Sequence, residues 1–177
     1  MTYLCCTKKL FKEMKFSHDQ IVPMVDDNSF LGEWYANLFK IAQHKFLIFT
    51  NKLTCFSFVC REVKISDIRN LPATFRQGIE TTLREEQVDE ANIQRILTDC
   101  QETMYSIPTD RVTTGLMVNH VLNLQFMVEN EGGLSCCPWP EIKKLMNHSP
   151  LFCSRPNSDP TSGKYAIERL KEKLGII

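Results

Sequence analysis

The sequence has no net charge and no long hydrophobic run. Lysine plus arginine and aspartate plus glutamate each number 21 among 177 residues, so the formal net charge is zero. A balanced charge excludes a whole-protein field that attracts polyanions, and nucleic-acid binding therefore needs a local basic patch. No apolar run approaches the roughly 18–20 residues of a membrane span, so we expect a soluble protein with no membrane partner.

Glycine-rich motifs and a secretory leader are also missing. The seven glycines form neither Gly-x-Gly nor Gly-Lys-Ser/Thr, which excludes the common phosphate-binding loops. The apolar stretch that begins at Tyr3 ends at Lys8 and Lys9, which is too short for a signal peptide. We therefore expect a cytoplasmic location, where most of the eight cysteines are buried thiols without disulfide bonds.

One segment contains residue types that bind zinc, namely Cys136, Cys137, His148 and Cys153. Structural zinc sites usually begin with two cysteines separated by two to four residues, whereas Cys136 and Cys137 are adjacent. We therefore expect neither a metal nor a cofactor, and the spacing leaves open whether these four residues bind zinc.

Apolar periodicity divides the chain into short strands and amphipathic helices. Strands are predicted at 2–6, 34–41, 45–50, 54–61 and 103–107, and helices at 7–14, 68–83, 89–100, 111–130, 140–147 and 165–174. Short polar breaks join the three middle strands. Connections of this length can join only antiparallel neighbours. The run from Phe46 to Phe49 is apolar at every position, which predicts the central strand of this meander.

This order of elements excludes a regular βαβ alternation. It predicts a single α+β domain over 1–177, with an antiparallel or mixed sheet built on the three-stranded meander. A long helix in the C-terminal half and several shorter helices, mainly on one side, are expected to pack on it. The long helix carries Met117, Val121, Leu124 and Val128 on one face, with Leu116, Leu122 and Phe126 widening the apolar stripe. We therefore expect it to pack across the sheet.

Polar or unusual residues at apolar places are the candidates for a ligand site: Trp34, Asn37, Asn51, Arg111 and Asn119. Asn51 has a structural explanation, because asparagine tolerates the positive φ of a tight turn. Arg111 opens the long helix, where the macrodipole disfavours a cation unless an anion compensates. Trp34, Asn37, Arg111 and Asn119 are candidates to line one pocket between sheet and helix. Capping and core hydrogen bonding are the favoured alternative.

The histidines and cysteines select no catalytic pair, because nothing in their spacing brings one thiol to one imidazole. His120 lies on the long helix, where we expect a buried, hydrogen-bonded imidazole rather than a catalytic base.

Three segments, 33–39 (EWYANLF), 45–51 (KFLIFTN) and 111–119 (Arg111 followed by GLMVN), resemble a family of small bacterial proteins known as a domain of unknown function. The resemblance runs from Cys-Thr-Lys-Lys-Leu near the start to Tyr-x-Ile-Glu-x-Leu-Lys near the end. The family pattern matches at Trp34, Ala36, Asn37, Thr50, Asn51, Arg111, Gly115 and Asn119. The chain departs from the pattern at His120, where an acidic residue is frequent, and by a longer insertion at 153–162. The resemblance implies a bacterial or phage-borne origin and a cytoplasmic location, and it brings no established activity.

Three functions remain as hypotheses. The first is a non-enzymatic binding or interaction module from the mobile part of a bacterial genome, with a protein partner on a surface formed by the sheet and long helix. The second is a small enzyme or sensor that binds an anionic small molecule in a Trp/Asn/Arg pocket. The third and weakest is nucleic-acid binding through the basic terminal helices, around Lys8–Lys15 and Lys164–Lys173.

Overall fold

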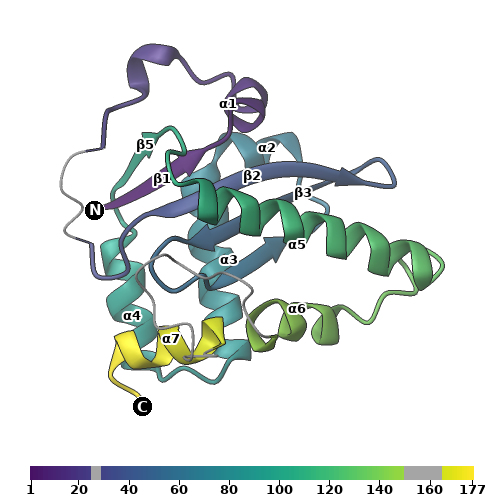
Figure 1. Ribbon diagram of the computed structural model, residues 1–177. Coiled ribbons are helices and arrows are strands. Elements are labelled where there is room, and N and C mark those ends of the chain that lie inside the picture. The colour runs from purple at the N-terminus through teal and green to yellow at the C-terminus, as the bar shows by residue number, and fades with distance from the viewer. Residues whose placement is uncertain (25–28, 150–164) are drawn as a thin grey trace.

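A five-stranded mixed sheet forms the centre of the computed structural model, which describes residues 1–24, 29–149 and 165–177 (Figure 1). The strands are β1 (Thr2–Cys6), β2 (Trp34–Ile41), β3 (His44–Asn51), β4 (Ser57–Cys60) and β5 (Thr103–Ser106), arranged in the order β4-β3-β2-β1-β5. β1 is parallel to both β2 and β5, whereas β2, β3 and β4 are antiparallel neighbours. The predicted α+β class and the meander are confirmed.

β3 is the central strand of the meander, as its unbroken apolar run predicted. Every residue from Phe46 to Asn51 is buried, because helices cover both faces of the sheet. A tight turn at Ala42 and Gln43 joins β2 to β3, with φ of 46° and 72°. Positive φ at both turn positions gives the backbone twist that suits a two-residue hairpin.

The helices follow the predicted periodicity closely. They are α1 (Lys8–Met14), α2 (Ile65–Arg69), α3 (Leu71–Glu85), α4 (Glu90–Asp99), α5 (Arg111–Asn130), α6 (Trp139–His148) and α7 (Ala166–Leu174), with a short 3-10 turn, η1 (His18–Gln20). The bounds of α5 are those predicted. The expected helix over 68–83 is instead two helices that meet at Asn70, whose φ and ψ are −104° and 51°.

The helices cover both faces of the sheet, and five of the seven α-helices that the structure describes pack on one of them, as the expectation of helices mainly on one side predicted. The alternation of side chains along β2 sends Trp34, Ala36 and Leu38 into one core and Tyr35 and Phe39 into the other. Buried residues of α1, α2, α3, α4 and α7 complete the first core, and those of α5 and α6 complete the second. Helix periodicity shows which face is buried, but it does not show on which side of a sheet the helix packs.

α5 lies across one face of the sheet, in front of β2 and β3 in Figure 1. Of the helices that the structure describes, none has the length and apolar character needed to cross a membrane.

Candidate functional site

Trp34 is a core residue. Its side chain is 1% exposed and packs edge-to-face on Phe58 and Phe75, with ring centroids 5.8 and 5.3 Å away. Such aromatic pairs stabilise a core beyond their buried area. The indole ring therefore packs the sheet against α3 rather than opening onto a binding pocket.

Asn51 organises the loop after β3. Its Nδ2 donates to the Leu31 carbonyl at 2.8 Å and to the Glu33 carbonyl at 3.3 Å. Its Oδ1 accepts from the backbone N–H and the hydroxyl of Thr54, at 2.8 and 2.9 Å. The expected positive φ is not at Asn51 but at Cys55, where φ is 63°. The asparagine is needed for its side-chain hydrogen bonds, which give partners to buried backbone groups of two loops.

The other predicted site residues lie elsewhere. Asn37, on β2, accepts a hydrogen bond from the Thr7 hydroxyl at 2.9 Å. Arg111 and Asn119 are exposed on α5, across the sheet from the core that contains Trp34. Trp34 and Asn51 are cross-strand partners, but the structure does not bring Trp34 into one pocket with Arg111 and Asn119.

Two hydrogen-bonding groups organise the start of α5, and one of them joins it to the sheet. The hydroxyl of buried Tyr35 accepts from the backbone N–H of Asp110 at 2.9 Å. Asp110 caps the helix, because its carboxylate accepts from the backbone N–H of Thr113 at 3.0 Å and also from the Thr113 hydroxyl. A carboxylate at this end offsets the unfavourable placement of Arg111 in the helix dipole.

An ion pair lies in the same region. Lys52 Nζ is 2.7 Å from Glu33 Oε1, and the two side chains are 32% and 11% exposed. Burial opposes the charge on Lys52, but the hydrogen bond and charge of Glu33 outweigh it and raise the pKa of the lysine. Glu33 also accepts a long contact from Cys5 Sγ, at 4.0 Å. These contacts stabilise the end of the sheet near the first turn of α5.

The face of α5 that points away from the sheet is the largest exposed apolar feature of this helix. Between Arg111 and Glu129 the helix has no charged residue. Val118, Leu122 and Phe126 lie four residues apart and are 47%, 57% and 65% exposed. We call the exposed residues Arg111, Gly115, Val118, Leu122, Phe126 and Glu129 the outer face of α5.

The prediction that Leu122 and Phe126 widen the buried stripe is wrong. The sheet covers one side of the helix and buries Thr113, Met117, His120, Leu124 and Val128, whereas the opposite side has no covering element among the described residues. A signal for this surface was present in the sequence. A helix that is apolar all round needs covering on every side, and one sheet provides covering on only one.

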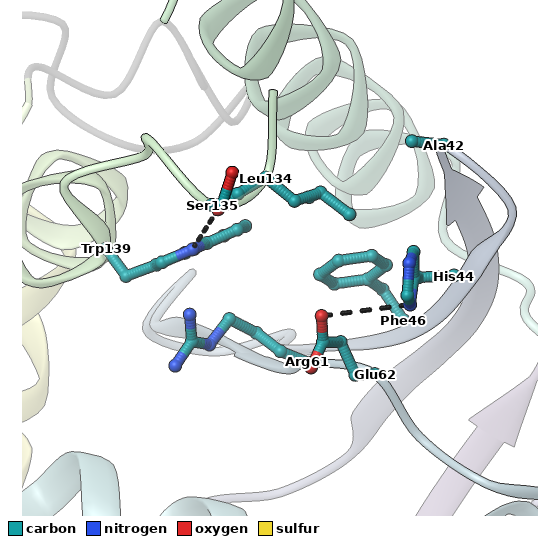
Figure 2. Close-up of a pocket in the computed structure, with 8 residues that line it drawn as sticks. All are labelled: Ala42, His44, Phe46, Arg61, Glu62, Leu134, Ser135 and Trp139. Atoms are coloured by element: carbon teal, nitrogen blue, oxygen red, sulfur yellow. Dashed lines mark hydrogen bonds and ion pairs between the residues drawn. The ribbon is translucent and has the colours of Figure 1, made fainter. Parts of the chain in front are cut away.

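A pocket of about 340 Å³ lies between the β2–β3 hairpin, the segment after β4 and the start of α6. Its lining residues are Ala42, His44, Phe46, Arg61, Glu62, Leu134, Ser135 and Trp139. Figure 2 shows Trp139, Leu134 and Phe46 around the pocket, with Arg61 beneath the Trp139 ring.

The pocket combines an apolar wall with charged groups. Phe46 stacks on Trp139 with centroids 5.9 Å apart, and the Trp139 indole N–H donates to the Leu134 carbonyl at 3.2 Å. The Arg61 guanidinium is 4.6 Å from the centroid of the Trp139 ring, a cation–π distance. His44 Nδ1 is 3.7 Å from Glu62 Oε1. A tryptophan and an arginine therefore share a pocket, but they are not Trp34 and Arg111.

Comparison with known proteins identifies a family. A family model described as "Domain of unknown function (DUF6933)" matches residues 3–167. The chain belongs to this family. No curated protein and no solved structure matches the chain.

In this DUF6933 member the residues that carried the resemblance have two kinds of environment. Trp34 and Asn51 are buried and fully engaged in packing or hydrogen bonds. Arg111, Gly115 and Asn119 are exposed on α5. The second group lies on the surface that a partner can reach.

His120 is buried, as predicted, but its Nε2 has no hydrogen-bond partner among the described residues. Burial lowers the pKa of His120 to about 4, so the imidazole is neutral near pH 7. The expected hydrogen bond is absent at Nε2 within the described part of the chain.

The zinc question concerns four residues, of which Cys153 lies outside the described part of the chain. Cys136 is exposed, Cys137 is buried, and His148 Nε2 is 2.7 Å from Glu86 Oε2. Within 1–24, 29–149 and 165–177, no group of three or more His, Cys, Asp or Glu residues is placed to hold a metal. Five of the seven cysteines in these ranges are buried, and no disulfide joins any of the seven.

The basic terminal helices, α1 and α7, lie at opposite ends of the molecule (Figure 1). Their lysines and arginines therefore do not form one continuous basic surface, and a single phosphate track across both helices is not available.

Proposed function

We propose that this protein is a non-enzymatic interaction module that binds a helix of a protein partner through the outer face of α5. The observation that carries the proposal is the row formed by Val118, Leu122 and Phe126 on a helix without charges between its two ends. Complete burial of one such side chain contributes about 1.5–3 kcal/mol, so covering the exposed part of each still yields roughly 1 kcal/mol. The family resemblance supports a bacterial cytoplasm, and a mobile genetic element, as the setting.

A helix is the partner shape that fits this surface. α5 has 20 residues, which corresponds to a length of about 30 Å. Side chains spaced four residues apart form a ridge, and ridges of this kind pack into the grooves of a second helix. Gly115 lies beside this ridge, with nothing within 4 Å of the position of a Cβ, so a large partner side chain has room there.

Site-specific photo-crosslinking in cells tests this proposal. A photoreactive phenylalanine analogue at Phe126 is expected to form a covalent adduct with a protein partner on irradiation. The matched control carries the same analogue at Gln94, an exposed residue of α4 on the other side of the sheet. Absence of an adduct at Phe126, or equal adducts at both positions, would contradict the proposal.

A second candidate function is binding of an anionic small molecule in the pocket of Figure 2. The arrangement that favours it is the Arg61 guanidinium against the face of the Trp139 ring, beside Phe46 and Leu134. An aromatic carboxylate fits this chemistry, with its ring on the apolar wall and its carboxylate on the guanidinium. Either a sensor or a small enzyme is compatible with such a site.

Benzoate is a suitable probe, and the two tryptophans supply the readout. In a ¹⁵N NMR titration, the indole N–H signal of Trp139 is expected to shift, while that of buried Trp34 stays in place. Arg61→Gln is expected to weaken binding at least tenfold. Shifts of both indole signals, or of neither, would contradict the assignment of this pocket.

A further inference from the structure

We infer that the partner helix is α5 of a second copy of this chain, packed antiparallel about a two-fold axis. This inference rests on the proposed function, because it names the occupant of the same outer face. It is carried by the order of residues along that face. When a second copy of the face runs in the opposite direction, opposite charges meet at the ends and apolar residues meet at the centre.

The charges at the two ends of the outer face are opposite. Arg111 lies at the first position of α5 and Glu129 next to the last, and both are exposed. Neither forms an ion pair among the residues that the structure describes. In an antiparallel pair each arginine faces the glutamate of the other copy, whereas a parallel pair places like charges together.

The same axis pairs the apolar residues. Position 120 is midway between Arg111 and Glu129, and it is also midway between Val118 and Leu122. A two-fold axis there places Val118 of one copy opposite Leu122 of the other, twice. The charged ends and the apolar centre therefore require one register.

The smallest and largest residues of the face also meet in this register. The midpoint between Gly115 and Phe126 also lies within one residue of position 120. Phe126 is 65% exposed, and the space above Gly115 is open. The phenyl ring of each copy thus fills the gap above the glycine of the other, so the helices approach closely.

The expected association is modest. One face of a helix about 30 Å long buries less than the roughly 1,200–2,000 Å² of a standard stable interface. The dimer should therefore depend on concentration, with a dissociation constant in the micromolar range, and on salt through its two end pairs.

Charge exchange at the two ends tests the inference on the purified full-length protein. Sedimentation equilibrium of the wild type is expected to show dimer formation. Arg111→Glu and Glu129→Arg each replace two attractive pairs by two repulsive ones and should each weaken the dimer about tenfold. The double variant R111E/E129R restores opposite charges and should dimerise within about twofold of the wild type.

Gly115→Ala is a second variant that does not depend on charge. Because nothing in the monomer lies within 4 Å of the added Cβ, the fold should persist, as circular dichroism can verify, while the dimer weakens at least threefold. Unchanged dimerisation in both charge variants, or a wild type that stays monomeric at 0.5 mM (about 500 times a dissociation constant of about 1 µM), would overturn the inference.

The two proposals fail in different ways. A monomeric wild type whose Phe126 crosslinks to another protein would end this inference and leave the interaction module standing. A monomer without any adduct at Phe126 would end both.

Discussion

The hydroxyl oxygen of Tyr35, on the central strand of the sheet, accepts a hydrogen bond from the backbone N–H of Asp110 at 2.9 Å. Asp110 is the N-cap of α5, so this contact connects the start of β2 to the point where the long helix begins. It holds the start of α5 against the sheet, while the buried side chains of Met117, Leu124 and Val128 determine which side of the helix faces the sheet. The outer face is the side of α5 opposite these buried residues.

Tyr35→Phe should lower the free energy of unfolding by about 1–2 kcal/mol, because the N–H of Asp110 loses its acceptor. Urea denaturation measures the change. Tyr3→Phe is the control, since the hydroxyl of Tyr3, on neighbouring β1, has no described hydrogen-bond partner, and it should shift stability by only a few tenths of a kcal/mol. Equal effects of the two substitutions would contradict the anchoring role of Tyr35.

Asn51→Ala should destabilise the protein by about 3 kcal/mol, because it leaves buried carbonyls and N–H groups of two loops without partners. Asn119→Ala, at an exposed position of α5, should change stability by less than about 0.5 kcal/mol. Chemical denaturation of both variants checks this contrast. A destabilisation by Asn51→Ala of the size found for Asn119→Ala would show that the loop hydrogen bonds contribute little.

Two glycine-to-alanine substitutions in helices should have opposite signs. At Gly78 an added Cβ would lie 2.6 Å from Phe58 Cε2 and 2.7 Å from Cys60 Sγ, so Gly78→Ala should destabilise by about 1–3 kcal/mol. At Gly115 there is open space, and Gly115→Ala should stabilise the monomer by up to about 1 kcal/mol through helix propensity. Thermal unfolding at a concentration well below the micromolar dissociation constant, where the monomer dominates, distinguishes them. If both substitutions changed stability in the same direction, either the close packing around Gly78 or the open space at Gly115 would be refuted.

His120 should make the protein less stable in mild acid. Its pKa is about 4 in the folded state and about 6.5 in an unfolded chain. As the pH falls from about 6.5 toward 4, the unfolded chain takes up a proton that the folded chain does not. The free energy of unfolding should therefore fall by about 3 kcal/mol across this window, and His120→Leu should remove that part of the loss. Parallel pH profiles for wild type and variant in urea would rule out this role.

Most of the secondary structure was predictable because local rules determine it. The apolar period identified α5 from Arg111 to Asn130, and the short polar breaks identified the meander. The sides of the sheet on which helices pack were not predictable, since the relevant contacts join residues far apart in the sequence. The break at Asn70, between α2 and α3, was also missed, because the apolar period continues across it.

The candidate site was less predictable than the fold. Trp34 and Asn51 were selected as unusual residues, yet their burial and partners show structural roles. Leu122 and Phe126 were assigned to the buried stripe because periodicity alone cannot distinguish apolar residues that the sheet covers from apolar residues that face outward. The pocket around Arg61 and Trp139 joins segments about 80 residues apart in the chain, and no local pattern connects them.

The mass of the protein in solution, measured as a function of concentration for wild type and Leu122→Asp, tests the association of the outer face of α5 most directly. The wild type should move from the monomer mass of 20.5 kDa toward twice that value between about 1 and 500 µM, a range centred on the micromolar affinity of a small interface. Leu122→Asp, which places a charge at the centre of the apolar row, should remain at the monomer mass throughout. Identical mass curves for the two proteins would contradict the account.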